Sequence, residues 1–214
     1  MKKMVNYFSQ FELVRLKRGQ VLLNPDEQIS HIYFLEKGYV KQYVISEDGE
    51  EITIHIFRNP SYFPMMLAIA GVSNKYFFEA LGSVEARKAP LEQTMEFVKN
   101  NPEALFDLTK RFAGGINGLA IRLENLVSER SYKRVVSFFL YLANTFGENR
   151  RGKVEIKLPL THKEIASWVN LTRETTSRQI EKLINKQLLT RSKLFFIVND
   201  TKELANQLKN PYLS

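Results

Sequence analysis

The sequence contains no cysteine. This absence excludes a disulfide framework, a cysteine-ligated zinc site, an iron–sulfur cluster and a thiol redox sensor. No apolar run is long enough to span a membrane, and Lys2 and Lys3 near the start are not followed by the apolar segment of a signal peptide. We therefore expect a cytoplasmic protein that does not associate with membranes.

The marks of catalysis are also missing. The sequence has no glycine-rich phosphate loop, no cluster of metal-ligand residues and no recognisable nucleophile with its base. We therefore predict no enzyme activity, no catalytic residue, no metal and no cofactor. An enzyme, or a cyclic-nucleotide module of a signalling protein, is the weakest of the function classes that we consider.

The net charge of +8 is unevenly distributed along the 214 residues. Residues 1–130 hold 16 basic and 16 acidic residues, whereas residues 131–214 hold 15 basic and 7 acidic residues. A basic module joined to a neutral one favours a polyanionic partner for the basic part. A basic domain without such a partner is the alternative that charge alone leaves open.

The first half of the chain shows the pattern of short strands separated by turns, from residue 13 to about residue 90. Alternating residues predict strands at 39–45 and 51–57, joined by a hairpin turn in which Asp48-Gly49 tolerates positive φ. Further strands are expected at 19–23, 29–35, 76–80 and 84–89. Short strands with frequent turns are typical of an antiparallel barrel or roll.

The pattern becomes helical from Pro102 onward. Apolar residues recur at alternating spacings of three and four, which is the pattern of a helix–helix seam. These residues are Phe112, Ile116, Leu119, Leu123 and Leu126. The seam predicts either a subunit interface or a helix packed on its own domain. Gly114, Gly115 and Gly118 lie in the same helix and each costs about 1 kcal/mol relative to alanine.

A second apolar helix is expected at 131–146, followed by a polar, basic loop at 147–153 and a short strand at 154–158. A new helix then begins at a well-marked point. Thr161 and Glu164 have the spacing of a capping box, and Leu160 and Ile165 that of a hydrophobic staple. Asn170 stands where a turn between two helices needs a left-handed residue.

The helix after this turn is predicted to begin at Thr172. Its side bearing Thr176, Ile180 and Leu183 is apolar, whereas Glu174 and Arg178 lie on the opposite side near the helix start. Such a polar face is typical of a recognition helix in the DNA major groove. Strands at 188–191 and 194–198 and a helix at 201–208 would complete a winged helix-turn-helix. The candidate DNA-binding residues are Thr161, His162, Thr172, Arg173, Glu174, Thr175, Ser177, Arg178 and Lys193.

With these motifs the chain resembles the cyclic-AMP receptor protein/fumarate-nitrate regulator (CRP/FNR) family over nearly its whole length. The segments that carry the resemblance are 33–38, 46–51 and the Arg173–Arg178 helix start. The resemblance implies an α+β fold: an N-terminal cyclic-nucleotide-binding-like antiparallel β-roll (1–103), a long dimerisation helix and hinge (104–130) and a C-terminal winged helix-turn-helix (131–214). It also implies a homodimer on an inverted repeat, with TTGA-type half-sites, and RNA polymerase as a partner.

The departures from the family pattern concern the ligand. The Gly-Glu-Leu and Arg-Ser segments of the family's cyclic-nucleotide binders are absent, so we predict no cyclic-nucleotide binding of that kind. An aromatic and methionine-rich stretch stands there instead and predicts either an apolar effector pocket or core. Its residues are Tyr62, Phe63, Met65, Met66, Tyr76 and Phe78. Regulation by an unknown effector, and constitutive DNA binding without one, both remain open.

Overall fold

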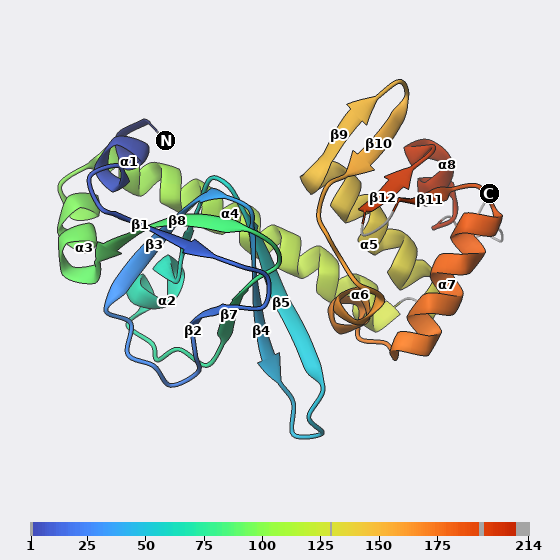
Figure 1. Ribbon diagram of the computed structural model, residues 1–214, viewed down its shortest axis with the longest axis horizontal. Helices are drawn as coiled ribbons and strands as arrows, with labels where there is room; N and C mark the ends of the chain where they lie inside the picture. The colour runs from blue at the N-terminus through green and yellow to red at the C-terminus, as the bar shows by residue number, and fades with distance from the viewer. Residues whose placement is uncertain (1, 129, 193–194, 209–214) are drawn as a thin grey trace. The chain divides into compact units, whose positions relative to one another are not determined.

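The computed structural model describes residues 2–128, 130–192 and 195–208. The chain forms two compact units, residues 1–119 and residues 120–214. The long helix α4 (Pro102–Ser128) contributes residues to both units (Figure 1). Within the described residues, none of the helices combines the length and the apolarity that crossing a bilayer requires.

The first unit contains two four-stranded antiparallel sheets. One has the strand order β1-β8-β3-β6 and the other the order β2-β7-β4-β5. Their bounds are β1 (Glu12–Leu16), β2 (Val21–Leu23), β3 (His31–Lys37), β4 (Tyr39–Ile45), β5 (Glu51–Arg58), β6 (Ser61–Phe63), β7 (Phe77–Ala80) and β8 (Val84–Pro90). Gly49 in the β4–β5 turn has φ of 77°, so the positive φ expected for this hairpin is confirmed. The predicted β-roll is the observed architecture.

Apolar residues from both sheets fill the interior of the roll. Successive side chains of a strand point to opposite faces, so the residues that β7 and β8 contribute to this cluster are two positions apart. The buried members are Leu23, Leu35, Val40, Phe63, Leu67, Phe78, Ala80, Val84 and Ala86. The stacked rings of Phe63 and Phe78, with centroids 5.5 Å apart, join the two sheets.

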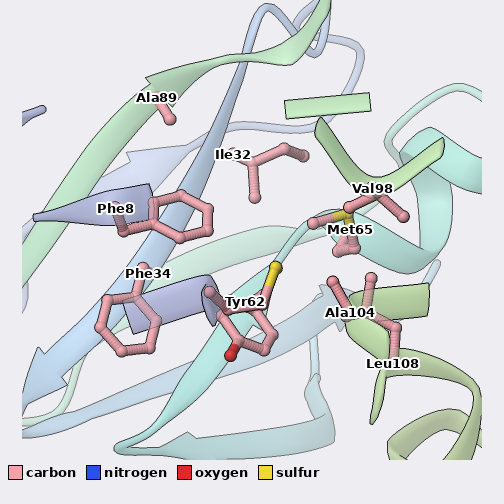
Figure 2. Close-up of a cluster of buried hydrophobic side chains, with 10 residues drawn as sticks. Phe8, Ile32, Phe34, Tyr62, Met65, Ala89, Val98, Ala104 and Leu108 are labelled. Carbon is pink, nitrogen blue, oxygen red and sulfur yellow. The ribbon is translucent and has the colours of Figure 1, made fainter. Parts of the chain in front are cut away.

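A second apolar cluster lies where helices cover the other face of the β3 sheet (Figure 2). Ile32 and Phe34 of β3 share this cluster with residues of α1 (Lys2–Phe8), α2 (Met65–Ala70), α3 (Leu91–Lys99) and the start of α4. The sequence pattern did not reveal α2 or α3. Both are short, and their apolar residues read equally well as continuations of neighbouring strands.

The second sheet also holds a buried charged network. Lys41 is only 3% exposed, and its Nζ lies 2.6 Å from Glu51 Oε1 and 3.8 Å from Glu79 Oε1. The hydroxyl of Tyr43 donates a hydrogen bond of 3.0 Å to the Glu79 carboxylate. Burial and the nearby Glu79 carboxylate raise the pKa of Tyr43, which keeps its hydroxyl protonated.

The second unit packs helices on another four-stranded sheet, of order β11-β12-β10-β9. Its elements are α5 (Ser131–Phe146), β9 (Gly147–Arg150), β10 (Lys153–Ile156), α6 (His162–Val169), α7 (Arg173–Asn185), β11 (Leu189–Ser192), β12 (Phe195–Val198) and α8 (Thr201–Asn206). Helix α5 has the predicted bounds and buries Val135, Phe139 and Leu142 completely.

The prediction of a loop at 147–153 is wrong. Residues 147–150 form strand β9 and pair with β10 in a hairpin. Polar and charged residues dominate β9, so the alternation that marks a strand is missing from its sequence. Gly147 allows this hairpin to begin close against α5. A Cβ at that position would lie 2.2 Å from the Ala143 carbonyl oxygen.

Candidate nucleic-acid interface

Helix α6 begins and ends as its sequence predicts. The Thr161 hydroxyl accepts a 3.2 Å hydrogen bond from the Glu164 amide, while the Glu164 carboxylate accepts a 2.6 Å bond from the Thr161 amide. This reciprocal pair confirms the capping box. At the other end Asn170 has φ of 51° and ψ of 58°, the left-handed conformation expected of the turn residue.

Helix α7 follows this turn and is capped by Thr172, whose hydroxyl accepts a 3.2 Å hydrogen bond from the Thr175 amide. One side of α7 is buried through Thr176, Ile180 and Leu183, as predicted, and through Gln179, which the sequence interpretation did not include. The opposite side is exposed. Its exposed charged residues are Arg173, Glu174, Arg178, Glu181 and Lys182.

Glu174 and Arg178 lie on the first two turns of this exposed side. Their spacing of four residues would allow an ion pair along the helix. Within the described ranges, however, neither side chain makes an ion pair or a hydrogen bond. Both charges are therefore available to an external partner without the loss of an ion pair or hydrogen bond to the described residues.

His162 connects three elements of this unit. Its Nδ1 lies 2.7 Å from the Ser177 hydroxyl of α7, and its Nε2 lies 3.2 Å from Nη1 of Arg191 on β11. The imidazole also stacks near the Phe196 ring of β12. Burial, followed by the charges of Arg191 and Arg173, lowers the pKa of His162, whereas Glu181 acts in the opposite direction. These contacts join residues distant in sequence, so no local pattern could have revealed them.

The wing strands β11 and β12 pair antiparallel, as expected. Arg191 and Ser192 at the end of β11 are exposed. Lys193, the predicted phosphate contact, lies outside the described residues. Its role remains a prediction from the sequence.

An arginine–tryptophan contact attaches the last part of α4, with which this unit begins, to α6. The Arg122 guanidinium lies 4.2 Å from the Trp168 ring centroid and donates a 2.8 Å hydrogen bond to the Trp168 carbonyl. Tyr141 of α5 stacks against the same indole, with ring centroids 5.2 Å apart. Burial lowers the pKa of Arg122 to about 10, which still leaves it charged at neutral pH.

The predicted seam of α4 is mostly exposed. Ile116, Leu119 and Leu123 have exposed fractions of 62%, 43% and 62%, and Leu126 is half-buried. Phe112 instead packs against the apolar cluster of the first unit. Two exposed apolar residues that the predicted seam omitted, Ile121 and Val127, lie on the same helix. Large apolar side chains repeated along a solvent-exposed helix are typical of a helix–helix interface.

The six residues proposed to line an effector pocket do not share one environment. Tyr62 and Met65 belong to the cluster beneath the helices, as Figure 2 shows, whereas Phe63 and Phe78 belong to the roll interior. Tyr76 packs at the edge of the interior cluster, and Met66 is 49% exposed. Burial raises the pKa of Tyr62 to about 12, so its hydroxyl is neutral at neutral pH.

Both parts of the chain match known protein families, and relatives match most of its length. A family model described as "Crp-like helix-turn-helix domain" matches residues 133–207, and one described as "Cyclic nucleotide-binding domain" matches residues 13–101. The chain is 30% identical over 193 residues to a global nitrogen regulator of Nostoc sp., covering 89% of this chain and 86% of that protein. It is also 30% identical over 175 residues to the transcriptional regulator SdrP of Thermus thermophilus, covering 80% and 82%.

Solved structures share the fold. FixK2 from Bradyrhizobium japonicum superposes with a TM-score of 0.80 at 18% identity, covering 92% of this chain and 96% of that one. TTHA1359 from Thermus thermophilus, described as a CRP/FNR-family transcriptional regulator, superposes with a TM-score of 0.72 at 26% identity, covering 91% and 97%.

Proposed function

The chain belongs to the CRP/FNR family of DNA-binding transcription regulators, and from this premise we propose that it acts as a homodimer that reads an inverted-repeat operator through α7. The observation that carries the proposal is that Glu174 and Arg178, on the first two turns of α7, are exposed and form no ion pair with any residue that the structure describes. The opposite side of the same helix is fixed in the core of its unit, so these two side chains are presented by a rigid element.

The chemistry of the two side chains suits base readout in the major groove. An arginine donates two hydrogen bonds to guanine O6 and N7, and a glutamate accepts from the cytosine amino group. A G·C pair in each half-site can satisfy both. The TTGA-type half-site that the family resemblance implies contains such a pair. Lys193 is proposed to contact phosphate and to add affinity without base preference.

Two copies are proposed to pair through α4. The exposed residues Ile116, Leu119 and Leu123 would be buried against the same residues of a second copy, which gives a two-fold symmetric interface. The same symmetry would place two α7 helices in successive major grooves, about 34–36 Å apart. We further propose that RNA polymerase is a partner and that the protein acts in the cytoplasm, where the DNA is.

An effector is proposed to control the spacing of the two α7 helices by biasing α4 between two arrangements. Gly114, Gly115 and Gly118 are the positions where this helix is intrinsically weakest. Because the nucleotide-binding segments are absent from the sequence, the effector is proposed not to be a cyclic nucleotide. Constitutive binding without an effector is the alternative, and it predicts the same operator affinity whichever small molecules are added.

Selection of bound sequences from a random DNA pool tests the proposed function. We expect enrichment of an inverted repeat whose half-site centres are one helical turn apart, with binding that weakens steeply as salt rises. The double variant Glu174→Ala/Arg178→Ala serves as the control and should enrich no half-site. Failure of the wild-type protein to enrich any sequence, or enrichment of the same sequence by the control, would overturn the proposal.

A further inference from the structure

The hydrogen bonds around His162 fix which atoms donate and which accept. Arginine has only donors, so the Arg191 guanidinium must donate to His162 Nε2 across their 3.2 Å contact. An imidazole that accepts at Nε2 and is neutral carries its proton on Nδ1. That Nδ1–H then donates to the Ser177 hydroxyl oxygen, 2.7 Å away.

This arrangement determines which acceptor the Ser177 hydroxyl can donate to. A helical serine often returns its hydroxyl proton to the carbonyl four residues earlier. Within the described residues the Ser177 hydroxyl makes no such bond, and its oxygen accepts from His162, so the O–H proton is available to an acceptor elsewhere. In the major groove the acceptors are purine N7, guanine O6 and thymine O4.

We propose that His162 is a positioning residue for sequence readout. It fixes Ser177 as a hydrogen-bond donor to one base pair and, while its own imidazole is uncharged, holds Arg191 of the wing in place. This inference rests on the proposed function and adds a residue that acts through its neighbours rather than on a base.

The charged groups around the imidazole define how acid would act on it. Arg173 and Glu181 face it from α7 and Arg191 from β11, while β12 contributes the uncharged Phe196 ring. Protonation places a proton on Nε2, and the contact with Arg191 then joins two cations that can only donate. The hydrogen bond between Arg191 and Nε2 is lost, and the imidazole adds one positive charge that is available to phosphate. The bond from Nδ1 to Ser177 is preserved, so base preference at the Ser177 position is retained.

A double-mutant cycle on base preference tests the link to Ser177. Operators with every base pair of one half-site substituted in turn are bound by wild type, His162→Ala, Ser177→Ala and the double variant. We expect each single variant to lose preference at the same base pair, by roughly 2- to 12-fold, as one hydrogen bond would. The double variant should lose no more than Ser177→Ala alone.

Two further variants separate positioning from folding. His162→Gln keeps one donor and one acceptor and should retain the preference. His162→Lys carries a permanent charge and cannot accept from Arg191, so random DNA should be bound with a salt slope steeper by about 1 at neutral pH. Lys163→Ala, an exposed change on the same turn, should leave base preference unchanged.

Acid provides an independent readout. As pH falls from 7.5 to 5.5, we expect wild type to bind random DNA with a steeper salt slope, and His162→Gln to show no such change. Additive losses in the cycle, losses at different base pairs, or identical pH profiles for wild type and His162→Gln would overturn the inference. If the wild-type protein enriches no operator, the proposed function fails instead, so the two failures are distinguishable.

Discussion

Strand β4 of the first unit and helix α7 of the second unit place charged side chains in opposite environments. In the first unit Lys41 is buried and contacts Glu51 and Glu79, so its charge is satisfied within the fold. In the second unit Glu174 and Arg178 of α7 are exposed and, in the described part of the chain, make no ion pair or hydrogen bond. A buried charge network constrains a structure, whereas unsatisfied charges on a rigid helix are available to a partner.

The largest effect should come from breaking the buried network. Lys41→Ala leaves two carboxylates without their cation, and we expect it to cost about 3–5 kcal/mol of unfolding free energy. Hydrogen exchange of the β4, β5 and β7 amides measures this loss within the first unit. The exposed Lys75→Ala is the matched control and should change little. A loss below about 1 kcal/mol for Lys41→Ala would show that the network is not a structural element.

The exposed pair of α7 should behave in the opposite way. Arg178→Ala or Glu174→Ala should reduce binding to the selected half-site by about 1–3 kcal/mol and relax its base preference. Unfolding stability should stay within about 0.5 kcal/mol of wild type, because no internal contact is lost. Competition binding with base-substituted operators, beside Lys182→Ala as control, measures the difference. Unchanged preference in Arg178→Ala would show that the reading face is wrongly assigned.

Acid should weaken the second unit through His162. Because the folded state lowers the pKa of this imidazole, the unfolded chain takes up its proton first as pH falls. The His162 contribution is therefore complete above the unfolded pKa, near 6.5, and is lost as pH falls toward the folded value. Trp168 is the only tryptophan, so its fluorescence reports unfolding of this unit. Equal losses in wild type and His162→Gln between pH 8 and 5.5 would contradict this assignment.

A modest gain in stability is expected in α4, the helix that contributes residues to both units. A Cβ at Gly115 would meet nothing within 4 Å, so Gly115→Ala should stabilise the helix by up to about 1 kcal/mol. If the glycines allow α4 to change arrangement, operator affinity should change as well. Thermal unfolding and operator binding, measured side by side, test both parts. Equal operator affinity for the two proteins would contradict the hinge but not the helix stabilisation.

The sequence predicted best where local chemistry decides the structure. The Thr161 capping box, the left-handed Asn170 and the Thr172 cap are short-range signals, and all three are present in the fold. The sequence predicted least where contacts are long-range. Burial of Lys41 depends on residues brought together by strand pairing, and the position of His162 depends on Ser177 and Arg191, which are 15 and 29 residues away.

The wrong prediction at β9 has a physical cause of its own. Strand β9 has few apolar residues, so its sequence lacks the alternation from which a strand is predicted. It forms a strand through its pairing with β10. The aromatic stretch around Tyr62, predicted to be either an effector pocket or core, is divided between two apolar clusters. Adjacent residues of a strand point to opposite faces, so Tyr62 and Phe63 enter different clusters.

Chemical probing of guanine N7 with dimethyl sulfate tests the central claim most directly, because this atom faces the major groove. On the selected operator, wild type should protect a guanine in each half-site, Arg178→Ala should lose that protection while still binding at higher concentration, and Lys182→Ala should keep it. Identical protection by wild type and Arg178→Ala, or none by wild type on a bound operator, would contradict the reading of DNA by the exposed side of α7.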